Sequence, residues 1–122
     1  MNTPFPLPVM ISEVGPRDGL QSIRTVMPTD AKLRWISALA AAGLKEIEVG
    51  SFVPAKLLPQ MADIREVVAH ALTIPGLNVA VLAPNLRGCE AAFESGVHKV
   101  TLPVSVTNEH SMANIRKTTD QM

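Results

Sequence analysis

The feature that most constrains the fold is the alternation of short apolar segments with helical patterns. Apolar segments at residues 9–14, 46–50, 78–83 and 99–104 have the composition and length of buried β-strands. A helical pattern follows each of them. Because strand–helix alternation places successive strands parallel through right-handed crossovers, the chain is predicted to form an α/β fold with a parallel sheet.

The helical patterns carry start and stop signals. Thr29 is predicted to cap a first helix over about 30–42, and Gly43 is predicted to end it. A second helix is predicted over about 61–72 from apolar residues at helical spacing. Asn85 is predicted to cap a third helix that ends at Gly96. Its apolar stripe is predicted to consist of Cys89, Ala92 and Phe93, and a fourth helical pattern lies near the chain end.

The loops are asymmetric, and this asymmetry distinguishes two α/β architectures. Long loops follow the first, second and fourth strands, whereas the returns from helix to strand are short. This is typical of a TIM (β/α)8 barrel, whose sites lie in the loops after the strands. A doubly wound sheet is the alternative, but no G-x-G-x-x-G turn follows the first strand. A full barrel needs about 250 residues and eight βα units. We therefore expect an arm at 1–8 and the first half of a barrel, with four units, at 9–122.

Composition excludes several classes of function. Lys+Arg and Asp+Glu both total 11, and only 3% of residues are aromatic. The chain therefore lacks the basic and stacking surfaces of a nucleic-acid binder. The single cysteine, Cys89, cannot form an internal disulfide, which is typical of a reducing compartment. No apolar run could span a bilayer, and the N-terminus does not resemble a signal or transit peptide. We expect a cytoplasmic protein without membrane or nucleic-acid partners.

Charged residues gather where the first two strands end. Since side chains alternate along a strand, Ile47 and Val49 are expected to face the helices and Glu48 to face the barrel interior. Glu13 lies near the end of the first strand. Interior carboxylates need a partner or a metal, and Arg17 on the next loop is the expected partner. A structural ion pair at the barrel mouth and a catalytic group are both compatible with this pattern.

Asp18 directly follows Arg17, so the two side chains are expected to diverge. By its position alone, Asp18 is more typical of a turn former than of a metal ligand, and Gln21 is more typical of a surface residue.

Three motifs carry a family resemblance. Residues 13–21 read EVGPRDGLQ, residues 48–63 read EVGSFVPAKLLPQMAD, and residues 81–92 read VLAPNLRGCEAA. Together they resemble, in the same order, motifs of the 3-hydroxy-3-methylglutaryl-CoA lyases, especially the bacterial branch. The resemblance implies a TIM barrel and metal-dependent cleavage of hydroxymethylglutaryl-CoA to acetyl-CoA and acetoacetate.

The resemblance also implies roles for individual residues. Asp18 would be a ligand of Mg²⁺ or Mn²⁺, and Arg17 would stabilise the enolate oxygen that develops during cleavage. Glu48 would hold Arg17, and Gln21 and Ser51 would line the pocket and bind the acyl-CoA substrate. A half-barrel with open edges would also be expected to form a homo-oligomer, a dimer or larger.

The family's His-x-His pair, its further asparagine ligand and its catalytic cysteine have no counterparts in these residues. The three histidines and the cysteine of this chain are therefore interpreted as residues without a catalytic or metal-binding role. We place His70 on a helix, His98 before the fourth strand and His110 in a loop. Cys89 is interpreted as a small core residue.

Two alternatives stay open. One is a related acyl-CoA lyase or a Claisen-type synthase, although those synthases usually carry Glu at the position of Leu20. The other is a non-catalytic half-barrel.

Overall fold

The computed structural model describes residues 8–122. Of the predicted N-terminal arm, residues 1–7 lie outside the described residues, and Pro8 is exposed. The helices and strands are, in chain order, β1 (Ser12–Glu13), η1 (Gly15–Gly19), α1 (Thr29–Ala41), β2 (Glu46–Ser51), η2 (Pro59–Met61), α2 (Ile64–Ala71), β3 (Asn78–Leu82), α3 (Leu86–Glu94), β4 (Lys99–Thr101), α4 (Asn108–Ile115) and η3 (Thr119–Gln121).

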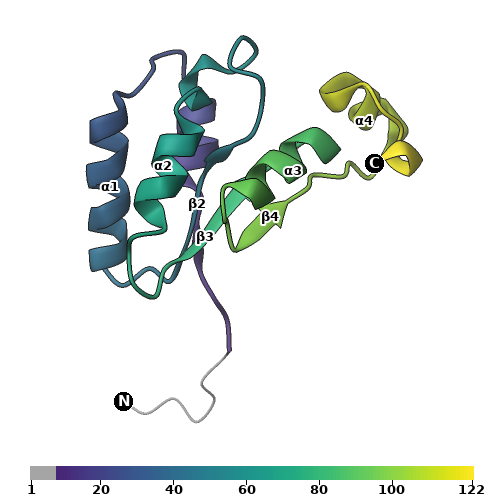
Figure 1. Ribbon diagram of the computed structural model, residues 1–122. Helices are drawn as coiled ribbons and strands as arrows, with labels where there is room; N and C mark the ends of the chain where they lie inside the picture. Colours follow the sequence, from purple (N-terminus) through teal and green to yellow (C-terminus); the bar gives the residue numbers. More distant parts are fainter. Residues whose placement is uncertain (1–7) are drawn as a thin grey trace.

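The four strands form one parallel sheet in the order β1-β2-β3-β4. In a doubly wound sheet the strand order reverses at a switch point, whereas a (β/α) barrel places each new strand beside the previous one. The observed order is therefore that of a barrel wall, and the doubly wound alternative is wrong. Figure 1 shows α1, α2 and α3 along the same side of this sheet.

The hydrophobic core lies between the sheet and these helices. Ile47 and Val49 of β2 face it, as predicted, and both are almost fully buried. They pack with side chains of α1, α2, β3 and α3, namely Ile36, Ile64, Val67, Val68, Ala71, Val79, Val81 and Ala92. Since side chains alternate along a strand, this orientation turns Glu46 and Glu48 to the opposite face of β2.

The two edge strands are shorter than predicted. β1 covers only Ser12–Glu13 instead of 9–14, and Val9 and Ile11 are each 71% exposed. The reason is register: Ser12 pairs with Glu46, the first residue of β2, so the preceding residues have no neighbouring strand. β4 likewise ends at Thr101, opposite the last residue of β3, and does not continue to residue 104.

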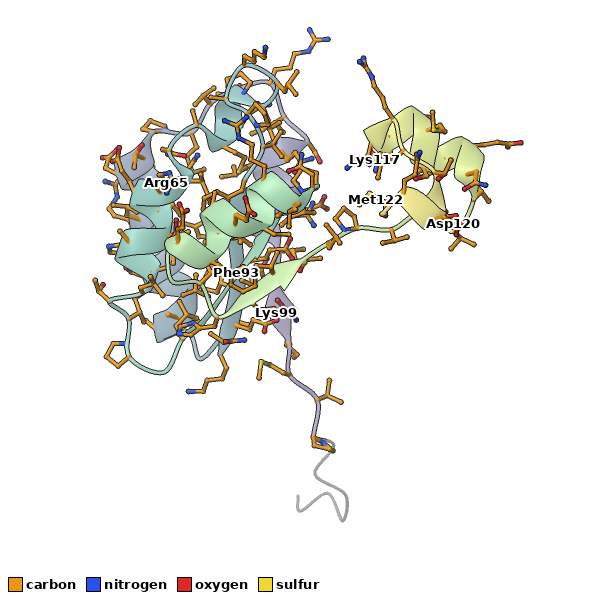
Figure 2. The ribbon with its side chains drawn as sticks, turned by 45° about the vertical axis from the view of Figure 1, so that its right-hand side comes forward. Arg65, Phe93, Lys99, Lys117, Asp120 and Met122 are labelled. Atoms are coloured by element: carbon orange, nitrogen blue, oxygen red, sulfur yellow. The ribbon has the colours of Figure 1, made fainter. Side chains whose placement is uncertain are left out.

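Three helix predictions are wrong in detail. Thr29 does not cap α1, because its hydroxyl donates to Asp63 instead, and Pro28 occupies the N-cap position. Phe93, marked on α3 in Figure 2, is 69% exposed and does not belong to a buried stripe. His110 lies within α4 and not in a loop.

By contrast, Asn85 caps α3 as predicted by accepting a hydrogen bond from the Gly88 amide.

The C-terminal segment with α4 and η3 stands apart from the sheet (Figure 1). Figure 2 shows Lys117, Asp120 and Met122 on this segment, away from Lys99 on β4. Among the helices of residues 8–122, none has the length and apolarity needed to cross a membrane.

A single buried carboxylate links all four strands. The Glu46 side chain on β2 is only 5% exposed. Asn78 of β3 donates to Oε1 over 2.5 Å, and Lys99 of β4 donates to Oε2 over 3.1 Å. Ser12 of β1 is paired with Glu46 in the register of the sheet and contributes to lowering the pKa of this carboxylate. Burial alone would raise the pKa of Glu46, but these hydrogen bonds and the charge of Lys99 outweigh burial and hold the pKa below its ordinary value.

This linkage predicts an acid-sensitive sheet. Because the pKa of Glu46 is lowered in the folded state, its stabilising contribution exists above the ordinary value of 4.5 and is lost as pH falls through the folded pKa. We expect the Glu46→Gln variant to lose less stability than the wild type between about pH 5 and pH 3. Urea unfolding at a series of pH values measures this difference.

Asp30→Asn is the matched control. Its pKa is also lowered, by Arg34, but this ion pair is exposed and solvent screens it, so its removal should alter the pH slope little. Equal slopes in the wild type and Glu46→Gln would contradict the assigned role of Glu46.

Candidate functional site

The residues after β1 form a tight helical turn where the sequence predicted the start of a long loop. In η1 the amides of Arg17 and Asp18 both donate to the Val14 carbonyl, over 3.1 and 2.7 Å. Pro16 at the start of the turn is buried. The predicted pairing of Glu13 with Arg17 is wrong. Glu13 Oε1 instead accepts a hydrogen bond from the Gly15 amide over 2.9 Å. The turn therefore fixes the backbone from which Arg17 and Asp18 project.

Arg17 and Glu48 form the central ion pair of the site. Arg17 Nε donates to Glu48 Oε1 over 2.8 Å, and their side chains are only 16% and 7% exposed. Glu48 lies on the face of β2 opposite the core, as predicted. A buried pair of this kind is costly to break, since removal of one partner leaves the other charge without compensation.

Asp18 lies beside the same guanidinium. Arg17 Nη1 donates to Asp18 Oδ1 over 3.0 Å, so the prediction that these side chains diverge is wrong. The guanidinium has several N–H groups in a fixed fork, and Nη1 can bind Asp18 while Nε binds Glu48. The Asp18 side chain is 62% exposed. Its other carboxylate oxygen therefore has access to a cation or a ligand.

Gln21, which lies after η1, and Ser51, the last residue of β2, come together. Ser51 ends β2, is fully buried, and its Oγ donates to Gln21 Oε1 over 3.3 Å. Gln21 lies two residues after the end of η1 and is half-buried, so it is not the surface residue that its position alone indicated. The five predicted site residues thus form one cluster of three, Arg17, Asp18 and Glu48, and one pair, Gln21 and Ser51. Both groups are built from β2 and the segment after β1.

The other reactive side chains have ordinary local contacts. His70 Nε2 lies 2.8 Å from Ser37 Oγ, and His98 Nδ1 accepts the Val79 amide at 2.9 Å. Cys89 is only half-buried, so it is not the core residue that was predicted. Within residues 8–122 no three His, Cys, Asp or Glu side chains group closely enough to hold a metal.

The sequence interpretation missed a buried polar cluster next to the site. Lys32, in the first turn of α1, is 3% exposed and donates to Asp63 Oδ1 over 2.7 Å. The spacing of the residues could have indicated that Lys32 is buried. Lys32 stands one helical turn before Ile36, which is buried, so both side chains lie on the core-facing side of the helix.

Comparison with known proteins gives a consistent result. A family model described as HMGL-like matches residues 8–122. A Pseudomonas aeruginosa protein, "3-hydroxy-3-isohexenylglutaryl-CoA/hydroxy-methylglutaryl-CoA lyase", is 48% identical over 91% of this chain and 37% of its own length. The chain therefore spans little more than a third of this relative.

Solved structures extend the similarity to three dimensions. A hydroxymethylglutaryl-CoA lyase from Pseudomonas aeruginosa matches with a TM-score of 0.85 at 46% identity, over 93% of this chain and 38% of that one. An HMG-CoA lyase from Acinetobacter baumannii, in complex with coenzyme A and 3-methylmalate, gives a TM-score of 0.85 at 38% identity, over 92% and 37%. The four βα units thus have the fold of the corresponding part of these TIM barrels.

The turn makes a steric prediction. A Cβ at Gly15 would lie 2.9 Å from Glu13 Oε1 and 3.1 Å from two ring atoms of Trp35. We expect Gly15→Ala to lower the free energy of unfolding by about 1–3 kcal/mol through overpacking. Denaturant unfolding followed by the fluorescence of Trp35, the single tryptophan, measures this change.

Gly19→Ala, at the other end of the same turn, is the control, since a Cβ there meets nothing within 4 Å. Its effect should stay within about 0.5 kcal/mol. A loss at Gly15 no larger than that at Gly19 would show that Trp35 and Glu13 do not confine the turn.

Proposed function

Because the chain belongs to the HMGL-like family, we propose that it forms part of a TIM-barrel lyase that cleaves 3-hydroxy-3-methylglutaryl-CoA to acetyl-CoA and acetoacetate. The observation that carries the proposal is the buried pair of Arg17 Nε and Glu48 Oε1, at 2.8 Å, with Asp18 on the same guanidinium. This arrangement places a fixed cation and an accessible carboxylate at the loop end of the sheet, where barrel enzymes carry their chemistry.

Arg17 is the proposed electrostatic catalyst. Cleavage of the carbon–carbon bond places negative charge on the oxygen of the departing enolate, and a guanidinium already fixed in position stabilises this charge without further reorganisation. The contact with Glu48 holds Arg17 in place. Since the Glu48 side chain is 7% exposed, water competes little for this contact. Glu48 therefore orients the cation.

Asp18 is the proposed ligand of a divalent cation, Mg²⁺ or Mn²⁺. Its carboxylate suits a hard cation, and only Oδ1 is bound to Arg17 while the side chain is 62% exposed. The donor set fits in part: the described residues hold no group of three potential ligands, so water or residues outside this chain would complete it. When bound, the cation supplies Lewis acidity that lowers the pKa of the substrate's tertiary hydroxyl.

Gln21 and Ser51 are proposed to contact the substrate. The 3.3 Å contact between them is long enough to be exchanged for a hydrogen bond to an incoming oxygen. The amide of Gln21 can donate and the hydroxyl of Ser51 can both donate and accept, which suits carbonyl and hydroxyl groups of an acyl-CoA.

A second substrate is favoured by one observation. The Pseudomonas aeruginosa relative is named for both isohexenylglutaryl-CoA and hydroxymethylglutaryl-CoA cleavage. Both substrates share the hydroxyglutaryl-CoA part that Arg17 and Asp18 would contact, and they differ in the alkyl group. The second candidate is therefore cleavage of a longer-chain 3-hydroxyglutaryl-CoA by the same residues.

The exposed edges of the sheet support association with further barrel strands. Apolar side chains beside β1 and β4 are open to solvent, including Ile11 at 71%, Val104 at 55% and Val106 at 99%. Such edges are prone to pair with other strands. We therefore include a homo-oligomeric enzyme in the proposal. We also include a cytoplasmic location, because a chain with a single cysteine forms no internal disulfide and is typical of a reducing compartment.

The proposal predicts that residues 1–122 alone release no acetoacetate, since they supply only one carboxylate to the metal. A chimera in which residues 9–122 replace the matching segment of the Pseudomonas aeruginosa lyase should release it when Mg²⁺ or Mn²⁺ is added. Comparison of kcat/KM for the two substrates then decides between the two candidates. An inactive chimera that folds as a barrel would overturn the proposed function, and release by residues 1–122 alone would overturn the predicted incompleteness.

Two variants of the chimera separate the proposed roles. Arg17→Met should retain metal affinity and lower kcat by about 10²- to 10³-fold, as for the loss of one oxyanion-stabilising donor. Asp18→Ala should weaken metal affinity, measured by calorimetric titration with Mn²⁺. Unchanged Mn²⁺ affinity in Asp18→Ala would remove Asp18 from the metal site.

A further inference from the structure

Lys32 is a buried cation with two hydrogen-bond partners, Asp63 and the Gln60 carbonyl, in the segment between β2 and α2. It is 3% exposed, although lysine side chains are almost never fully buried unless paired. Its Nζ donates to Asp63 Oδ1 over 2.7 Å and to the Gln60 carbonyl over 2.5 Å. Thr29 Oγ1 donates to Asp63 Oδ2 over 2.8 Å. The start of α1 is therefore joined to the loop that leads from β2 into α2.

The same cluster reaches the loop after β1. Gln60 Nε2 donates to the Ile23 carbonyl over 2.5 Å. Ile23 lies two residues after Gln21, and residues 22–26 are all exposed. An exposed segment has few packing contacts to fix it, so a hydrogen bond from Gln60, whose backbone carbonyl is bound by Lys32, has a large effect on its position.

The cluster therefore connects both loops that carry the site. One loop follows Arg17, Asp18 and Gln21, and the other follows Ser51 and contains Gln60. Gln60 is the residue that joins the two loops, because its side chain binds the Ile23 carbonyl and its own carbonyl accepts from the Lys32 ammonium. A charged donor in a water-poor setting makes a stronger and more rigid hydrogen bond than a neutral surface group.

We propose that Lys32 is a positioning residue, which acts through Gln60 to fix the loops after β1 and β2 relative to each other and so sets the distance between Gln21 and Ser51. The effect on turnover rests on the proposed lyase function, whereas the effect on the loops does not. Lys32 itself makes no contact with Arg17 or Asp18 among the hydrogen bonds and ion pairs of the described residues. It therefore acts at a distance from the reacting groups.

Hydrogen–deuterium exchange of the 122-residue chain tests the effect on the loops. In Lys32→Met, backbone amides of residues 20–27 and 52–62 should exchange about tenfold faster than in the wild type, while Val79 and Val81 in β3 remain unchanged. A purely structural role would instead accelerate exchange in the core and in the loops together. Arg34→Met is the matched control, because it removes an exposed cation from the same helix and should leave both loops unchanged.

Gln60→Met provides a second variant that retains both buried charges. It removes the side-chain bond to Ile23 and keeps the carbonyl that binds Lys32, so it should accelerate exchange in residues 20–27 only. If both variants leave residues 20–27 as protected as in the wild type, or if core amides exchange faster to the same extent as the loops, the inference is wrong.

The active chimera tests the effect on chemistry. Gln60→Met should lower kcat by about 10- to 100-fold, as for a displacement of positioned groups, with Mn²⁺ affinity unchanged. Unchanged kcat with faster loop exchange would overturn the positioning role in catalysis. A chimera without any lyase activity would defeat the proposed function alone, because the exchange measurements on the 122-residue chain still decide whether Lys32 fixes the loops.

Discussion

Two carboxylates on one strand determine how this half of a sheet is arranged. Glu46 and Glu48 lie on the face of β2 opposite the hydrophobic core, and their side chains are only 5% and 7% exposed. A charge with so little access to water needs partners nearby. Glu46 obtains them from all of the other strands, and Glu48 obtains Arg17 from the turn after β1. The need of a buried carboxylate for partners therefore has two consequences. The partners of Glu46 link the strands of the sheet, and the partner of Glu48 forms the centre of the candidate site.

The turn after β1 and the start of α1 complete this arrangement. Gly15 allows the backbone to pass close to Glu13 and Trp35, and Arg17 of the same turn donates to Glu48. On the helix side, Lys32 and Asp63 bring the beginnings of α1 and α2 together. Charged pairs therefore flank the core on two sides, and each pair joins segments that lie about thirty residues apart in the sequence.

Several features followed from local patterns in the sequence. The period of the apolar residues predicted the order of strands and helices, and Asn85 capped α3 as expected because an N-cap depends only on the next few residues. Alternation along β2 correctly separated Ile47 and Val49 from Glu48. The extents of β1 and β4 were wrong, because a strand ends where its neighbour ends. The preferred partner of Thr29 was wrong for a similar reason, since Asp63 is brought to it by the packing of α2 on α1.

The sequence by itself determined the class of fold and the two faces of β2, because these depend on periodicity, and its short motifs nominated the residues of the candidate site. Only the tertiary structure decided how those residues are paired. It placed Asp18 on the guanidinium of Arg17, gave Glu13 to the backbone of its own turn, and buried Lys32 against Gln60 and Asp63. A polar side chain chooses its partner from whatever donors and acceptors lie within about 3 Å. That set is fixed by segments distant in the sequence, which no local pattern describes.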